Sequence, residues 1–145
     1  MSRVYLSGPI SGITHDEAVR RFRGAQSKWE SLGYSVVNPL RNGLPYDADW
    51  RRQMAVDLCN LSSCDTVYML DGWQSSDGAC LELMCALTRN IRVYFETMID
   101  VEFMAYLVRA ANEMRVALRL DEKLMFDAEW YAAQCVANGY FEQPK

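Results

Sequence analysis

The sequence contains a single histidine, and its five cysteines form no CxxC pair. Zinc sites need about four histidine, cysteine or carboxylate ligands at short spacings, so we expect no metal site, and no motif indicates another cofactor. An odd number of cysteines, without a secretory signal peptide, favours reduced thiols in a cytoplasmic protein. The thiols are those of Cys59, Cys64, Cys80, Cys85 and Cys135.

Positive charge and long apolar runs are also scarce. Lysine and arginine number 15 against 19 acidic residues, which gives a net charge of −4. Nucleic-acid binding usually needs a basic face, so we expect a small-molecule ligand instead, although the N–H groups of one helix end could hold a single phosphate. No apolar run approaches the roughly 20 residues that span a bilayer, so no membrane association is expected.

With 145 residues, 50% of them hydrophobic, the chain is long enough to bury a core. Short apolar strands alternate with amphipathic helices over its first two thirds. Strands are predicted at residues 3–7, 34–37, 66–70 and 91–95, and helices at 16–32, 50–61 and 79–88. This alternation predicts an α/β fold, with a Rossmann-like or flavodoxin-like parallel sheet between helices.

Apolar residues at helical spacing predict the buried side of each helix. In the helix at 16–32, which Gly33 ends as a C′ glycine, they are Ala18, Phe22, Ala25, Trp29 and Leu32. In the helix at 50–61, which Asp49 can cap, they are Trp50, Met54, Leu58 and Leu61.

Beyond Thr97 the pattern changes to amphipathic helices at residues 101–118 and 128–137. We therefore divide the chain into an α/β domain at residues 1–97 and a C-terminal helical extension at residues 98–145. The extension is expected to pack on that domain or on a partner subunit.

The segment Ser76-x-Gly78-x-x-x-Glu82 joins a polar loop to a helix. Gly78 lets the backbone turn tightly, Ser76 offers a hydroxyl, and the helix start offers free N–H groups, which together suit an anion. Glu82 leans back toward the same opening and is the candidate catalytic carboxylate. On spacing alone, the alternative is that Ser76 or Asp77 caps the helix and Glu82 favours its dipole.

Asp57 lies on the predicted inward side of the helix at 50–61, seven residues after Trp50 and three after Met54. A carboxylate on a buried stripe is costly unless it is paired or functional. Asp57 is therefore a second catalytic candidate. The alternative is that this edge of the stripe reaches solvent.

Three loops follow the carboxyl ends of predicted strands, where open α/β sheets bind ligands. Gly8 and Ser11 follow the first strand, Asn38 follows the second, and residues 71–78 follow the third. The first loop lacks the P-loop lysine and a full dinucleotide glycine pattern, so an ordinary turn is its alternative interpretation. Trp73 and Tyr46 could stack on a base or gate the opening, or else fold back on their own domain.

His15 is the only histidine and also falls in a polar turn. It could contact a phosphate, and the alternative is a solvated loop side chain.

On these residues the sequence resembles the DUF4406 proteins, often found in phages and prophages. It also resembles the wider nucleoside 2-deoxyribosyltransferase-like superfamily, which includes 2′-deoxynucleoside 5′-monophosphate N-glycosidases. The resemblance covers roughly residues 3–95. It rests on residues 4–12, Gly33-Tyr34 through Asn38-Pro39, Asp57-Leu58, Cys64-Asp65, Gly72-Trp73, and Ser76-x-Gly78-Ala79 with Glu82.

The resemblance implies that Glu82 attacks the anomeric carbon of a deoxyribosyl group. Water or another base would then resolve the covalent intermediate, much as in retaining glycosidases. Asp57 would orient the sugar or handle a proton at the base, and Tyr5 would contact the nucleophile.

The resemblance also implies that Gly8, Ser11 and Ser76 line the sugar and phosphate region, and that a homo-oligomer completes the site. Ser11 stands where some hydrolases of the superfamily have a basic residue, so the need for a 5′-phosphate stays open.

The leading hypothesis is a hydrolase or transferase that acts on the N-glycosidic bond of a nucleoside or nucleotide. The first alternative is a non-catalytic nucleotide-sensing module of phage or prophage origin, which would keep the pocket without needing Glu82. The second is a phage interaction protein that works through its C-terminal helices.

Overall fold

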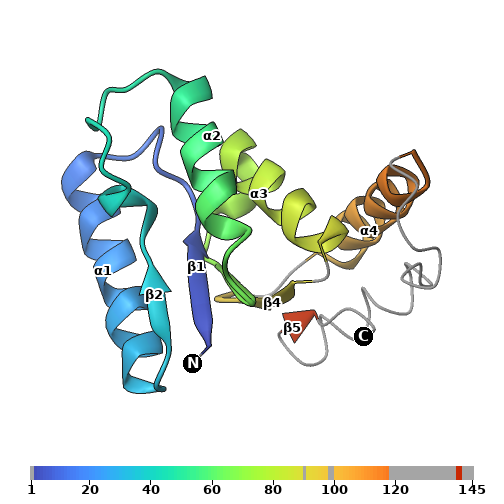
Figure 1. Cartoon of the computed structure of the whole chain (residues 1–145), viewed down its shortest axis with the longest axis horizontal. Coiled ribbons are helices and arrows are strands. Elements are labelled where there is room, and N and C mark those ends of the chain that lie inside the picture. Colours follow the sequence, from blue (N-terminus) through green and yellow to red (C-terminus); the bar gives the residue numbers. More distant parts are fainter. Residues whose placement is uncertain (1, 90, 98–99, 118–139, 142–145) are drawn as a thin grey trace.

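The computed structural model of the chain describes residues 2–89, 91–97, 100–117 and 140–141. These residues form a five-stranded sheet in the order β2-β1-β3-β4-β5 (Figure 1). Its strands are β1 (Arg3–Ser7), β2 (Ser35–Val37), β3 (Thr66–Met69), β4 (Arg92–Phe95) and β5 (Tyr140–Phe141). Strands β1 to β4 are parallel, which confirms the predicted α/β fold, whereas the short antiparallel strand β5 was not predicted.

Helices alternate with the parallel strands along the chain. Every boundary predicted from the sequence lies within two residues of the observed one, where the structure describes it. The helix predicted at 128–137 lies outside the described residues. The observed helices are α1 (His15–Ser31), α2 (Trp50–Leu61), α3 (Asp77–Thr88) and α4 (Val101–Ala117), with short 3₁₀ helices η1 (Pro39–Arg41) and η2 (Trp73–Ser75).

The strand order reverses between β1 and β3. The chain passes from β1 to β2 on one side, and then crosses to β3 on the other side of β1. Ser7 pairs with Met69 at the carboxyl ends of these two strands. Connections that leave in opposite directions open a crevice at this edge, where α/β proteins of this topology bind ligands.

Two apolar clusters cover the two faces of the sheet. Among the described helices, α1 packs on one face, whereas α2, α3 and α4 lie on the other (Figure 1). Successive strand residues point to opposite faces, so Val4 and Leu6 join the α1 cluster while Tyr5 joins the cluster beneath α3. Tyr5 and Ser7 are therefore directed to the side of the sheet that α3 covers.

Helix α1 matches its predicted pattern except at its end. The Thr14 side chain caps the helix by accepting a hydrogen bond from the Glu17 N–H at 3.1 Å. Ala18, Phe22, Ala25 and Trp29 are buried as predicted. Leu32 is 60% exposed, contrary to prediction, because it is the C-cap residue and the chain turns at Gly33 with a φ of 91°.

Helix α2 buries Met54 and Leu61 as predicted, and Leu58 is half-buried. Trp50 was predicted to point inward, but it is 52% exposed because the helix begins at this residue, beyond the part of α2 that covers the sheet. Asp49 occupies the N-cap position, although its side chain makes no capping hydrogen bond.

Helix α4 packs against α3. Met104, Leu107, Val108 and Ala111 are buried in the same cluster as Leu83 and Leu87 of α3. The first described helix of the predicted C-terminal extension thus shares its core with the sheet.

Candidate functional site

A cavity of about 520 Å³ lies at the carboxyl edge of β1, in the crevice that the strand order creates. Its wall is formed by the loop after β1, the start of α1, the segment from η1 into α2, and the first turns of α3. Pockets for small molecules typically measure about 300–1,000 Å³. The cavity therefore has the volume that a ligand the size of a nucleoside requires.

Glu82 lines this cavity from α3 and is only 5% exposed. The Tyr5 hydroxyl donates a hydrogen bond to its Oε2, and the Ser7 hydroxyl donates to its Oε1 at 2.9 Å. Both donors come from the same face of β1. The two hydrogen bonds fix the carboxyl group in one orientation at the cavity wall.

Burial has a large effect on the acidity of Glu82. The pKa of this carboxyl group rises from 4.5 to about 8, and burial is the largest cause. The charge of Asp57 raises the pKa further, whereas the hydrogen bonds from Tyr5 and Ser7 lower it. Burial also raises the pKa of Tyr5 well above its ordinary value, and the charges of Glu82 and Asp57 add to this effect. Tyr5 therefore stays protonated and remains a hydrogen-bond donor to Glu82.

Asp57 is the second carboxyl group at the cavity and is 6% exposed. It is thus buried on the inward side of α2 rather than at a solvent-reaching edge. The Asn42 Nδ2 group donates a hydrogen bond to its Oδ1 at 2.9 Å. Burial raises the pKa of Asp57, and the Asn42 hydrogen bond opposes that rise.

The loop between η1 and α2 is tied to α2 by two amide side chains, those of Asn42 and Gln53, that the sequence did not single out. The Asn42 amide also donates to Gln53 Oε1 at 3.2 Å, and its own Oδ1 accepts from the Leu44 N–H at 3.0 Å. Gln53 donates in turn to the Tyr46 carbonyl at 3.1 Å. An Asn-Gly pair is a turn signal, but nothing in the spacing indicated that Asn42 would reach Asp57.

The start of α3 combines the two interpretations of Ser76. Its Oγ accepts a hydrogen bond from the Ala79 N–H at 3.2 Å, which caps the helix, and the residue also lines the cavity. Gly78 was predicted to allow a tight turn, but it lies inside the first turn of α3. A Cβ there would lie 3.3 Å from Met54 Sδ, so Gly78 instead allows α2 and α3 to approach closely.

Two residues predicted to bind substrate do not line the cavity. Trp73 is fully buried because η2 turns its ring into the core, against Phe95 and Phe103 at centroid distances of 5.7 Å. Asn38 caps η1 by accepting from the Leu40 N–H, and it donates to Gln26 Oε1 at 3.1 Å. Both side chains are structural in this fold.

The other predicted contacts do line the cavity. Gly8 and Ser11 lie in the loop after β1, and the His15 and Tyr46 rings meet edge to face at a centroid distance of 4.1 Å. The exposed Trp50 also lines the cavity, although the helical pattern placed it in the core. Two aromatic side chains, Tyr46 and Trp50, therefore line the cavity, whereas Trp73 does not.

No three histidine, cysteine, aspartate or glutamate side chains of the described residues are grouped so as to hold a metal ion. None of the helices in this part of the chain combines the length and the apolar composition needed to span a bilayer.

The family model for a domain of unknown function, DUF4406, matches residues 2–95. The matched segment contains β1 to β4 and each of the described residues that line the cavity. A comparison with curated proteins found no match. Because the family model covers well over half of the sequence, the chain belongs to the DUF4406 family.

Proposed function

We propose that this protein cleaves the N-glycosidic bond of nucleosides or nucleoside 5′-monophosphates, with Glu82 as the nucleophile. The observation that carries the proposal is the placement of Glu82. Its carboxyl group lines a cavity of suitable volume, is held through both oxygens, and lies near a second buried carboxyl group, that of Asp57.

The chemistry follows that of a retaining glycosidase. A Glu82 oxygen forms a bond to the anomeric carbon of the sugar while the bond from that carbon to the base nitrogen breaks. The base leaves with the electron pair and takes up a proton, which Asp57 can supply when it is protonated. Water then attacks the same carbon, gives a proton back to the Asp57 carboxylate, and releases the sugar and the Glu82 carboxylate. If a second base attacks instead, the product is a new nucleoside.

Tyr5 and Ser7 are positioning residues in this scheme. Their hydroxyl groups donate to the two oxygens of Glu82, and such bonds favour the ionised form that attacks the sugar. Ser11 and Ser76 line the cavity with hydroxyl groups that suit the sugar, and Tyr46 offers a flat ring that suits the base.

The test is release of free base from a panel of deoxynucleosides and their 5′-monophosphates. Wild-type protein is expected to release base from at least one of them, and Glu82→Gln to release it at least about 1,000-fold more slowly because the nucleophile is lost. Glu30→Gln is the matched control, since Glu30 is exposed near the end of α1. Equal rates for wild type and Glu82→Gln would refute the assignment of Glu82. A second base added to the assay distinguishes transfer from hydrolysis.

The pKa of Glu82 favours one second candidate, a nucleotide-sensing module without catalysis. A pKa of about 8 leaves this group largely protonated at neutral pH, and a neutral carboxyl group can bind a ligand through hydrogen bonds without attacking it. Ligand binding by the wild-type protein, with no base released at any pH up to 9, would support this second function over the first.

A homo-oligomer and a cytoplasmic location belong to the same proposal. They rest on the resemblance and on the free thiols of the four described cysteines, Cys59, Cys64, Cys80 and Cys85. Light scattering of the purified protein tests the oligomer, and a monomer that cleaves substrate at full rate would remove it from the proposal.

A further inference from the structure

The charged side chains that line the cavity are mainly of one sign. Asp57, Asp77 and Glu82 line it, and His15 is the one basic side chain beside them in the described part of the chain. Neither lysine nor arginine from the described ranges contributes to the lining. Among the residues that the structure describes, a phosphate group would therefore meet carboxyl groups without a guanidinium or ammonium partner in the cavity lining.

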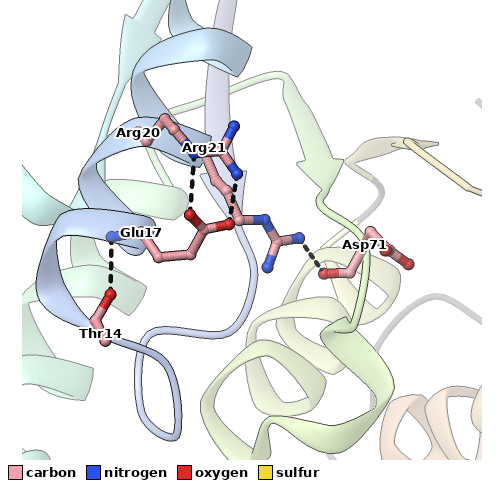
Figure 2. A network of polar contacts seen from close by, with 5 residues as sticks. All are labelled: Thr14, Glu17, Arg20, Arg21 and Asp71. Carbon is pink, nitrogen blue, oxygen red and sulfur yellow. Dashed lines mark hydrogen bonds and ion pairs between the residues drawn. The ribbon is translucent and has the colours of Figure 1, made fainter.

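The arginines near the start of α1 are engaged elsewhere, as Figure 2 shows. Arg20 Nη2 lies 2.5 Å from Glu17 Oε1 in an ion pair. Arg21 Nη2 donates to the Asp71 carbonyl at 2.5 Å, which ties α1 to the loop after β3. Although α1 begins at the cavity with His15, its first two guanidinium groups thus have other partners.

The start of α3 is the helix N-terminus beside Glu82 in the cavity wall, and helix N-termini can hold an anion because they carry a partial positive charge. Asp77 is the first residue of α3 and lines the cavity, so a carboxylate already lies at that position. The Ala79 N–H is bonded to the Ser76 hydroxyl. Asp77 and Ser76 therefore already offset the partial positive charge at the start of α3.

The cavity also disfavours negative charge at its inner wall. Burial raises the pKa of both Glu82 and Asp57, which means that the surroundings there stabilise the neutral forms. A phosphate monoester brings a further charge of about −1.5 to −2 near neutral pH. Uncharged sugar hydroxyls and base edges, in contrast, can bond to the Ser11, Ser76 and Asn42 side chains that line the same cavity.

We infer that the substrate of this cavity is an uncharged nucleoside rather than its 5′-monophosphate. The inference rests on the proposed function, since it names the substrate class of the same site. It follows from the sign of the lining charges, the engagement of Arg20 and Arg21, and the carboxylate at the start of α3.

Equilibrium binding to Glu82→Gln tests the inference, because this variant should not consume the ligand. Calorimetry would compare each deoxynucleoside with its own 5′-monophosphate at the same pH and ionic strength. The nucleoside is expected to bind roughly tenfold or more tightly, because the phosphate of the monophosphate meets charges of its own sign. Equal or tighter binding of the monophosphates, or no binding of either, would overturn the inference.

Two charge variants test its electrostatic origin in the same background. Asp77→Asn removes a cavity carboxylate, and Ser11→Lys adds a cation to an exposed turn that lines the cavity. Each variant is expected to bind the monophosphate more tightly, and so to reduce the ratio of nucleoside affinity to monophosphate affinity several-fold. Glu30→Gln changes the net charge like Asp77→Asn but lies away from the cavity, so it should leave the preference unchanged. If Asp77→Asn and Ser11→Lys both keep the preference that Glu82→Gln shows without them, the electrostatic argument is wrong.

The outcomes also separate this inference from the proposed function. Nucleoside-selective binding without base release by the wild-type protein would refute the function and leave the inference intact. Base release that is faster from monophosphates than from nucleosides would support the function and overturn the inference.

Discussion

Two opposing effects act on the Glu82 carboxyl group. Burial raises the pKa of Glu82 to about 8. The Tyr5 and Ser7 hydroxyl groups oppose this rise, because they donate hydrogen bonds that favour the charged form. A nucleophile must be ionised to attack. The same burial that removes competing water therefore limits the fraction of active protein at neutral pH.

The rate of base release should consequently rise with pH. We expect kcat/KM to increase through a midpoint of about 8 and to level above it, because Glu82 loses its proton over that range. Tyr5→Phe removes a donor that lowers this pKa, so it should move the midpoint to higher pH. A pH–rate profile of both proteins checks this. A rate that stays level or falls as the pH rises toward 8 would contradict an ionised Glu82 as the nucleophile.

The raised pKa also predicts a stability change in Glu82→Gln. The folded protein keeps the Glu82 proton up to about pH 8, whereas the ordinary value is 4.5. As pH rises between these values the unfolded chain ionises first, so wild-type stability falls. Gln carries no charge, and the variant should gain on wild type by about 1–3 kcal/mol between pH 5 and 8.

Urea denaturation at several pH values measures this gain. Glu30→Gln, which changes an exposed side chain, should alter stability by less than about 0.5 kcal/mol. A Glu82→Gln variant that loses stability steadily with rising pH relative to wild type would contradict the burial argument.

Single residues differed in how far the sequence could place them. Asp57 was identifiable because a carboxylate on an apolar stripe violates the local pattern, whereas Glu82 was identified from the Ser76-x-Gly78-x-x-x-Glu82 segment together with the family resemblance. Ser7 was not singled out, although it shares a strand face with Tyr5 and bonds the same carboxyl group. Asn42 could not be found, because its contact with Asp57 depends on how a loop folds back on α2.

At the scale of elements, periodicity and caps predicted the helices and strands well. Gly33 and Thr14 lie at the ends of α1, where local chemistry dictates a start or stop. The short helix η2 was not predicted, so the sequence left open whether Trp73 contacts a ligand or folds back on its own domain, and the structure buries it in the core. The direction of a loop side chain depends on tertiary packing, which the local sequence does not encode.

The loop between η1 and α2 is expected to depend on Asn42. Asn42→Ala removes the hydrogen bond to Asp57 and the link to Gln53, so the Asp57 carboxyl group loses its fixed orientation and its pKa rises further. We expect kcat/KM to fall roughly tenfold or more, equivalent to about 1–3 kcal/mol.

Steady-state kinetics and limited proteolysis of the loop check this expectation. Asn60→Ala is a suitable control, since Asn60 lies at the far end of α2 and does not line the cavity. If the kinetic constants of Asn42→Ala match those of wild type, Asn42 has no positioning role.

At the scale of the whole molecule, alternation of strands and helices was enough to predict a parallel α/β sheet. The strand order was not predicted, and neither was β5, because a strand of two residues owes its existence to pairing with β4. The reversal between β1 and β3 decides where the cavity lies. The position of the site is thus a property of the topology, whereas its chemistry is a property of a few side chains.

Helix α4 is predicted to be part of the folding unit. Met104 is fully buried between α4 and the rest of the core, so Met104→Ala should lower the free energy of unfolding by about 2–5 kcal/mol. Tyr106→Ala, at an exposed position on the same helix, is the control and should change it by less than about 1 kcal/mol. Thermal and urea unfolding measure both, and similar values for the two variants would contradict the packing of α4.

The central claim, that Glu82 forms a covalent bond to the sugar, is tested most directly by trapping the intermediate. A nucleoside fluorinated at the sugar C2′ position disfavours the oxocarbenium-like transition state, and with a good leaving base it should accumulate the glycosyl-enzyme. We predict that intact-mass spectrometry shows one added sugar per chain, that fragmentation places it on Glu82, and that Glu82→Gln stays unmodified. A sugar attached to any other residue, or base release from this compound without an adduct, would contradict the claim.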